Sequence, residues 1–146
     1  MSKFSLPKTE PKISEENALK ELFLLIERYK IDVDAMQGKV KEATEQTLDV
    51  VLDAIMKGEL SIAMVDGEVK VTQHIQHQSK GSTVKELVYA EMRGKDHSAM
   101  SKDASEYTKM TELLGSMCET AGGQSAVEQL RASDRKTAEA LALLFL

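Results

Sequence analysis

The sequence predicts an α+β fold: a small antiparallel sheet of about three strands within residues 60–92, packed with two helices before it and two or three after it. Residues 60–92 are the one stretch that combines a period-2 apolar alternation with hairpin turn signals. On both sides of this stretch, apolar residues recur every three or four positions, as on the buried face of a helix. Because a small sheet needs helices against one face to be stable, the α+β class follows.

The 146 residues fit one domain of ordinary size. We expect a flexible N-terminal arm over residues 1–13 and a single α+β domain over 14–146, made of a helical hairpin (14–58), a β-meander (60–92) and a helical part (96–146). The arm is polar and contains Pro7 and Pro11, which disfavour regular structure. Phe4 and Leu6 could instead anchor the arm to a partner.

The first helix is expected to begin after Ser14, because serine is a good N-cap residue and Glu15 and Glu16 suit the positive end of the helix dipole. Its apolar positions have helical spacing and form a broad face. They are Leu19, Leu22, Phe23, Leu25, Ile26 and Tyr29.

The second helix is expected from about Asp34 to Lys57, with Gly58 as its stop, which makes it roughly 36 Å long. Such a long helix could pair with the first helix or with the same helix of another subunit. The intramolecular hairpin is favoured because that partner is already in the chain. Its apolar stripe is Met36, Val40, Ala43, Thr47, Val51 and Ile55.

Asp66-Gly67 is a signal for a type I′ hairpin between the first two strands. A polar loop with Gly81 follows, and we expect a third strand from Val84 to Met92, although the segment KELVYAEM is also compatible with a helix. The expected buried face is Leu60, Ile62 and Met64 on the first strand, Val69, Val71, Gln73 and Ile75 on the second, and Val88, Ala90 and Met92 on the third, with Leu87 off that face.

Three cap signals divide the C-terminal part. Asp96 can cap a short helix through Met100, Ser105 or Asp103 can cap a helix over 107–119, and Ser133-Asp134 can cap the last helix. Gly122-Gly123 marks a stop, and Ser125 begins a short turn. The last helix has the apolar residues Ala138, Leu141, Ala142, Leu144 and Phe145.

Composition excludes several function classes. The net charge is −5 with both signs mixed along the chain, so we expect no nucleic-acid partner. No apolar run approaches the length of a membrane span, and we expect no membrane partner. A single cysteine excludes an internal disulfide, and the first residues lack the apolar region of a secretory signal, both of which fit a cytoplasmic location.

The sequence contains no recognisable catalytic motif, so we expect no enzyme activity, no metal and no cofactor. His74 and His77 form an HxxH pair, but at a strand end these positions point to opposite faces. Cys118 is expected near the C-terminal end of a helix, where nothing lowers the pKa of its thiol, so we interpret it as a buried structural cysteine.

Two apolar segments are candidates for partner binding. The chain ends on an apolar stripe, whose Leu141 and Leu144 are expected in the core. The alternative is that this stripe projects Leu144, Phe145 and Leu146 to a partner. On the second helix, Met36 and Val40 are the corresponding candidates.

The second half of the chain resembles the tail assembly chaperones of long-tailed phages and Mu-like prophages. In that family a hairpin with a glycine turn is followed by an "xxLxxxExR" segment, an acidic helix start and a closing "xxLxxxDxxxxxxxxxxFL" element. Over roughly half of the chain, the matching positions are Gly81, Thr83, Val84, Leu87, Glu91, Arg93, Asp96, Leu130, Asp134, Leu141 and Phe145.

The resemblance implies a non-enzymatic factor in the cytoplasm of the bacterial host cell that holds the phage tail tape measure protein while the tail tube polymerises. It also implies self-association. The sequence departs from the family in the two helices before the sheet and in lacking a proline after the Arg93 segment. The alternative interpretations are a virion structural or adaptor protein of the tail-completion or neck type, and a small regulatory or enzyme domain.

Overall fold

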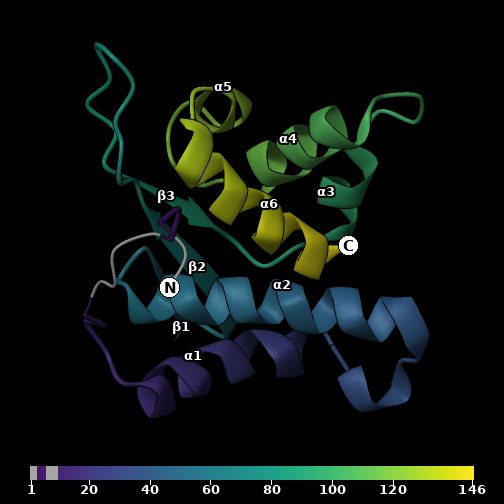
Figure 1. Cartoon of the computed structure of the whole chain (residues 1–146). Helices are drawn as coiled ribbons and strands as arrows, with labels where there is room; N and C mark the ends of the chain where they lie inside the picture. The colour runs from purple at the N-terminus through teal and green to yellow at the C-terminus, as the bar shows by residue number, and fades with distance from the viewer. Residues whose placement is uncertain (1–2, 6–9) are drawn as a thin grey trace.

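A computed structural model describes residues 3–5 and 10–146, and it has the predicted α+β architecture, with a three-stranded antiparallel sheet and helices on both of its sides (Figure 1). The helices before the sheet are α1 (Glu15–Arg28), a 3₁₀ turn (Val33–Ala35) and α2 (Gly38–Met56). The strands are β1 (Leu60–Val65), β2 (Glu68–His74) and β3 (Glu86–Tyr89). The later helices are α3 (Gly94–Ser98), α4 (Glu106–Met117), α5 (Gln124–Glu128) and α6 (Ala132–Phe145).

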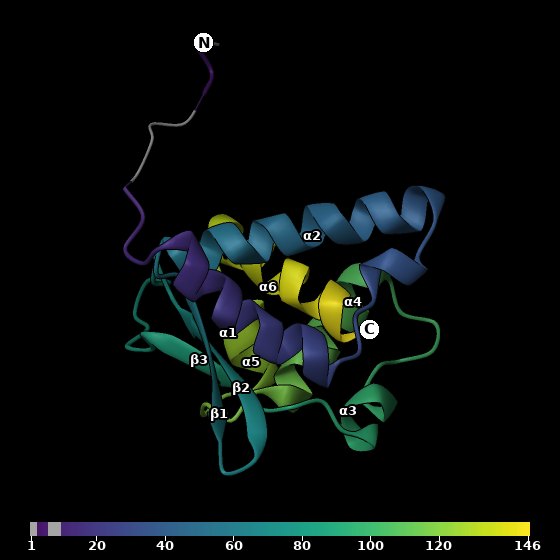
Figure 2. The ribbon, with the colours of Figure 1, turned by 90° about the horizontal axis from the view of Figure 1, so that it is seen from below.

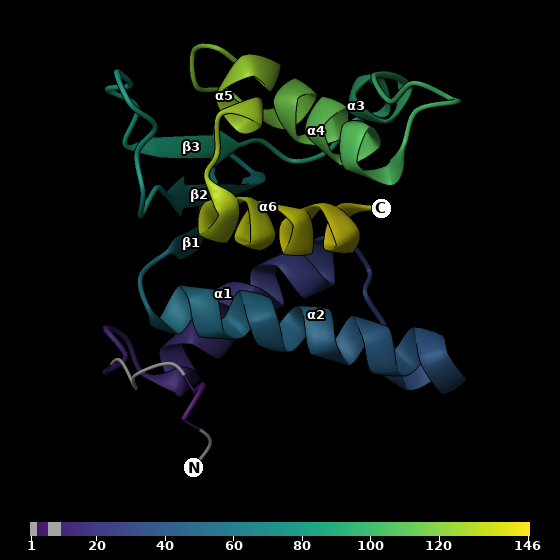
Figure 3. The ribbon, with the colours of Figure 1, turned by 45° about the horizontal axis from the view of Figure 1, so that its top comes forward.

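Helix α6 lies at the centre of the fold and contacts both α2 and α4. Helix α1 lies against β1 and packs beside α2, and the views in Figures 2 and 3 show α6 between α2 and α4. One apolar cluster joins helices and strands from all three predicted segments, with Leu25, Ile55, Leu87, Leu114 and Leu141 fully buried. No helix in the described part of the chain is both long and apolar enough to cross a membrane.

The turn of the β1–β2 hairpin is as predicted, but Met64, expected on the buried face of β1, is 44% exposed. The strand order is β1-β2-β3, and Val65 pairs with Glu68 across the two-residue turn. Asp66 and Gly67 have φ of 51° and 83°, which is the geometry of a type I′ turn and explains the preference for Asp-Gly there.

The third strand differs from the prediction in length and in facing. It spans Glu86–Tyr89 rather than Val84–Met92, and its buried residues are Leu87 and Tyr89, whereas Val88 is only half-buried. Apolar residues occupy both alternating sets in this segment, so the sequence could not select the face. The register selects it: Tyr89 pairs with Val71, and Leu87 pairs with Gln73, on the core face of β2.

Residues 117–120 cover the outer edge of β3. The Ala90 N–H donates to the Met117 carbonyl at 2.8 Å, and the Glu119 N–H donates to the Val88 carbonyl at 2.7 Å. The Val88 N–H donates to the Thr120 hydroxyl at 3.0 Å. These bonds satisfy an edge that would otherwise be open to another chain.

The cap of α1 is confirmed, since the Ser14 hydroxyl accepts the Asn17 N–H at 3.2 Å. Helix α2, however, begins at Gly38 instead of Asp34 and is 19 residues long. A separate 3₁₀ turn, capped by the Asp32 carboxylate, precedes it, and Gly38 has a φ of 60°. This left-handed conformation interrupts the helix and is one that glycine adopts without strain.

The predicted flexible arm is too long at its C-terminal end. The backbone N–H groups of Lys12 and Ile13 both donate to the Met56 carbonyl, at 2.8 and 3.2 Å, and so fix the chain to the end of α2. Phe4 is 84% exposed. Residues 1–2 and 6–9 of the predicted arm, including Leu6, lie outside the described residues.

The C-terminal caps are confirmed in part. Ser105 caps α4, which ends at Met117 rather than residue 119. Asp96 lies in the first turn of α3, where its carboxylate accepts the Arg93 N–H, so Arg93 and not Asp96 is the N-cap residue. Helix α6 begins one residue after Arg131, so the predicted Ser133-Asp134 cap is wrong.

Asp134 instead caps the chain beyond β2. Its side chain is 3% exposed, and its two carboxylate oxygens accept the N–H groups of Gln76, at 3.0 and 3.2 Å, and of His77, at 3.0 Å. The Asp134 carbonyl accepts from the side-chain amide of Gln73 at 2.7 Å. The Tyr89 hydroxyl donates to the Gln73 amide oxygen at 2.8 Å, so a buried polar chain joins β3, β2 and α6.

The neighbouring Arg135 ties α6 to α4. Its guanidinium donates to the Thr111 hydroxyl at 2.6 Å and to the Tyr107 carbonyl at 2.9 Å, lies 3.8 Å from the Tyr107 ring centre, and pairs with Glu139 at 3.0 Å. Because Arg135 is only 6% exposed, these partners are needed to offset the loss of its hydration.

We expect Asp134→Ala to destabilise the fold by about 2–3 kcal/mol, because it leaves two backbone N–H groups without a charged acceptor. Ser133→Ala is the matched control and should stay within about 0.5 kcal/mol of wild type, since Ser133 is exposed and is not the cap. Urea unfolding measures both. If only Ser133→Ala lowered the free energy of unfolding, by about 1 kcal/mol, Ser133 would be the N-cap of α6, as the sequence predicted.

We expect Gly115→Ala to destabilise by about 1–3 kcal/mol. A Cβ at Gly115 would lie 2.5 Å from the Cα of Gln124, so α4 and α5 would have to separate. Gly94→Ala, where a Cβ meets nothing within 4 Å, should be neutral or slightly stabilising. Equal thermal midpoints for the two variants would contradict this account of the α4–α5 contact.

Candidate functional site

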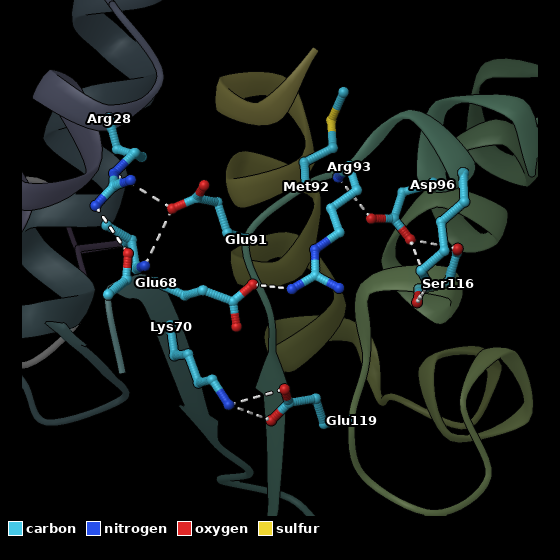
Figure 4. Close-up of polar contacts among 12 residues, drawn as sticks. Arg28, Glu68, Lys70, Glu91, Met92, Arg93, Asp96, Ser116 and Glu119 are labelled. Carbon is cyan, nitrogen blue, oxygen red and sulfur yellow. Dashed lines mark hydrogen bonds and ion pairs between the residues drawn. The ribbon is translucent and has the colours of Figure 1, made fainter. Parts of the chain in front are cut away.

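Charged side chains gather where the hairpin, the end of β3 and α3 meet (Figure 4). The Glu91 carboxylate accepts the Val69 N–H at 3.1 Å and lies 3.3 Å from Arg28 Nε. Arg28 also donates to the Gly67 carbonyl at 3.1 Å. Glu91 therefore connects α1, β2 and the chain after β3.

Ion pairs next to Glu91 extend this group of charged side chains, which we call the polar cluster. It consists of Arg28, Glu68, Lys70, Glu91, Arg93, Asp96 and Glu119. Arg93 pairs with Glu68 at the start of β2, and Lys70 Nζ contacts both carboxylate oxygens of Glu119, at 2.8 and 3.0 Å. The hydrogen bond that Lys70 donates to Glu119 raises the pKa of Lys70. These are surface pairs between long side chains, so each contributes little to stability by itself.

Asp96 is the buried member of the cluster. Its carboxylate accepts from Ser116 Oγ at 2.5 Å and from the Arg93 N–H at 2.8 Å, and lies 3.3 Å from Lys95 Nζ. Burial acts to raise the pKa of the Asp96 carboxyl, but the hydrogen bonds from Ser116 and Arg93, together with Lys95, outweigh burial and hold the pKa below its ordinary value.

Tyr29 reaches the same region from α1. Its hydroxyl oxygen accepts the Met92 N–H at 2.8 Å, and its ring centre lies 5.1 Å from that of Phe145. Burial raises the pKa of Tyr29 to about 12, so the phenol stays protonated at neutral pH. The contact links the polar cluster to the end of α6.

The polar cluster contains Glu91, Arg93 and Asp96, three positions of the resemblance motif, and encloses a hollow of about 180 Å³ next to Cys118. Its acidic and basic groups pair with one another. Burial raises the pKa of the Cys118 thiol, whose Sγ lies 3.8 Å from the Thr120 carbonyl. The arrangement holds chain segments together.

The histidines of the HxxH pair, His74 and His77, do not form a metal site with other side chains that the structure describes. His74 Nε2 lies 3.4 Å from Ser61 Oγ, its Nδ1 lies 3.5 Å from Glu86, and His77 follows in the loop. Within residues 3–5 and 10–146, no group of three His, Cys, Asp or Glu side chains is placed to hold a metal ion.

The candidate partner-binding residues fall into two groups. Leu144 and Phe145 are buried, 6% and 4% exposed, so the projection of these two residues to a partner is wrong: α6 turns them toward the core. Leu146 and Val40 are exposed, at 56% and 64%, and Met36 is half-buried. Partner binding by these three stays a prediction.

An apolar surface lies between α2 and α6, and the exposed Val40 precedes it by one helical turn on α2. Two adjoining hollows, of about 150 and 500 Å³, share Ala43, Thr47 and Leu143 in their linings. Val50 and Leu143 are about half exposed there, at 49% and 51%. We call Ala43, Thr47, Val50 and Leu143, together with Val40, the α2–α6 surface.

Sequence reasoning missed Val50 and Leu143 because it described one apolar stripe for each helix. The spacing of three, four and three residues along 40, 43, 47 and 50 was the available signal, since it defines a second stripe beside the buried Val51 and Ile55.

No protein-family model, curated protein or solved structure matches this chain.

The contribution of Asp96 should depend on pH. Because the pKa of its carboxyl is lower in the folded chain, the ionised form stabilises the fold; this contribution is complete above the ordinary carboxyl pKa, near 4, and disappears as pH falls through the lower folded value. Asp96→Asn should therefore cost about 1–3 kcal/mol at pH 7 and much less near pH 3. Urea unfolding at both pH values tests this.

Asp103→Asn, at an exposed position, is the control for the pH series and should differ little from wild type at either pH. A cost of Asp96→Asn that is the same at pH 3 and pH 7 would show that the charge of Asp96 is not what stabilises α3.

Proposed function

We propose that this chain is a non-enzymatic tail assembly chaperone of a long-tailed phage or prophage, which binds the tape measure protein in the cytoplasm of the bacterial host cell. The observation that carries the proposal is the α2–α6 surface, where apolar residues at helical spacing remain exposed. The family resemblance in the second half of the chain supplies the kind of partner.

The shape of this surface suits a helical ligand. A shallow groove between two helices accepts the apolar face of a third helix, whose contacts recur at intervals of three and four residues. The groove is lined by small side chains such as Ala43, Thr47 and Ala140, which let another helix approach closely. A tape measure protein is long and helical in this family, so many such contacts can act together through avidity.

The polar residues at the rim of the α2–α6 surface favour reversible binding. Lys136 and Glu139 of α6 and Gln46 of α2 line the wider hollow beside the apolar residues. A rim of both signs keeps the uncovered surface hydrated, and the moderate apolar area limits the affinity of any single contact. A factor that must leave the tail needs this property.

Co-expression with a candidate tape measure protein tests the proposal. We expect wild-type chain to co-purify with it and to increase its soluble fraction, and Val50→Asp or Leu143→Asp to weaken binding about tenfold, since an unpaired charge in an apolar contact costs 1.4 kcal/mol or more. Phe23→Asp, at an exposed apolar residue that lines neither hollow, is the control and should behave as wild type.

No co-purification and no gain in solubility would count against a chaperone. Recovery of the chain from purified particles would favour the alternative, a structural or adaptor protein of the virion, because a chaperone departs before assembly is complete.

A further inference from the structure

We infer that two copies of this chain associate through α2, with the two helices antiparallel and related by a twofold axis near Gln46. The inference does not depend on the proposed function, because both partners are the chain itself. It rests on the shape of α2, on its exposed apolar residues and on the order of the charges beside them.

Helix α2 has two apolar stripes, one facing the core and one facing outward. Its inner face buries Val51, Ala54 and Ile55 in the core. Its outer stripe, Val40, Ala43, Thr47 and Val50, alternates intervals of three and four residues, which is the spacing of a seam between two paired helices. Val40 is 64% and Val50 49% exposed, so the stripe is uncovered in the single chain.

The N-terminal half of α2 also extends beyond the neighbouring helices (Figures 1 and 3). From Gly38 to Ala43, no residue is buried, in contrast to the segment from Val51 to Ile55. A second helix can therefore lie along this outer stripe without displacing any part of the chain.

The charges beside the stripe select a second copy as the occupant. Lys39, Gln46 and Asp53 are spaced seven residues apart and so lie along one flank of the stripe. In an antiparallel pair centred on Gln46, Lys39 of each copy faces Asp53 of the other, and the two Gln46 amides face one another. In a parallel pair, this flank would instead face the opposite flank of the partner helix, where Lys39 would meet Thr44 and form no ion pair.

Both charged groups are available for this pairing. Lys39 makes no ion pair within residues 3–5 and 10–146, and it is exposed. Asp53 pairs with Lys57 at 2.9 Å but has a side chain 60% exposed, so one carboxylate can accept a second cation. The self-complementary arrangement fits the isologous contact of a twofold dimer.

Leu143 enlarges the contact. It lies on α6 beside Ala43 and Thr47, half exposed, and lines the same hollow as Val50. This hollow belongs to the α2–α6 surface, so a second copy and the helical partner proposed above would compete for it. The dimer would cover the apolar stripe until a partner displaces the second copy.

Charge reversal tests the inference on the purified chain alone. Sedimentation equilibrium should give a mass of twice 16.1 kDa for wild type at high concentration. Lys39→Glu and Asp53→Lys should each raise the dimer Kd at least about tenfold, because each converts two attractive pairs into two repulsive ones. The double variant restores opposite charges and should return to within about threefold of wild type.

Two further variants check the apolar contact and the axis. Val50→Asp should abolish the dimer, whereas Phe23→Asp should leave it intact. In a Cys118→Ser background, Gln46→Cys should form an intermolecular disulfide rapidly on mild oxidation, while Gln78→Cys, in the β2–β3 loop, should not. Circular dichroism confirms that each variant keeps its helix content.

A wild-type chain that stays monomeric at about 0.1 mM, or a dimer unaffected by Lys39→Glu and Val50→Asp, would overturn the inference. So would a double variant no better than the single ones. Since no tape measure protein is present in these measurements, a negative result here leaves the proposed function to its own co-expression test, and the reverse also holds.

Discussion

The buried carboxylate of Asp134 fixes where the last helix sits. Its oxygens accept the backbone N–H groups of Gln76 and His77 after β2. The carbonyl of Asp134 also accepts from Gln73, whose side chain in turn accepts from Tyr89. These bonds place the start of α6 against the sheet. Because the rest of α6 follows from that start as a rigid rod, the positions of Leu141, Leu143 and Phe145 follow as well.

The two faces of α6 then have different surroundings. Arg135 binds α4 through Thr111 and the Tyr107 carbonyl, and Phe145 meets Tyr29 of α1. Leu143, on the side between α2 and solvent, has no such cover. The exposed apolar surface is therefore a consequence of how the polar chain through Asp134 orients the helix.

The polar cluster and the α2–α6 surface contribute in different ways. Around Glu91, Arg93 and Asp96, charges pair with one another and with backbone groups, and this fastens the hairpin to α1 and α3. At the α2–α6 surface, apolar groups are left without partners within the single chain. This uncovered stripe is the feature on which both proposals depend, because a helix of a second copy or of another protein can pack its apolar face against it.

Local signals in the sequence determined much of this protein: the α+β class, the Asp66-Gly67 turn, the Ser14 and Ser105 caps and the end of α2 at Gly58. Each depends on neighbours within about four residues, so the sequence carries it directly. The stripe predicted for α2 is correct only in part, because Val51 and Ile55 are buried whereas Val40 and Ala43 are exposed. Glu91, Arg93 and Asp96 are neighbours in sequence, but no local signal could indicate Arg28, Glu68 or Ser116, which join them from distant segments.

Only the tertiary structure decided the face of β3, the task of Asp134 and the exposure of Val50 and Leu143. In β3, either alternating set could be buried, and pairing with Val71 and Gln73 made the choice. Asp134 looks like a helix cap in sequence, yet its acceptors serve a loop 57 and 58 positions away. Exposure of an apolar residue depends on which elements pack beside it, and that is a property of the whole fold rather than of any local pattern.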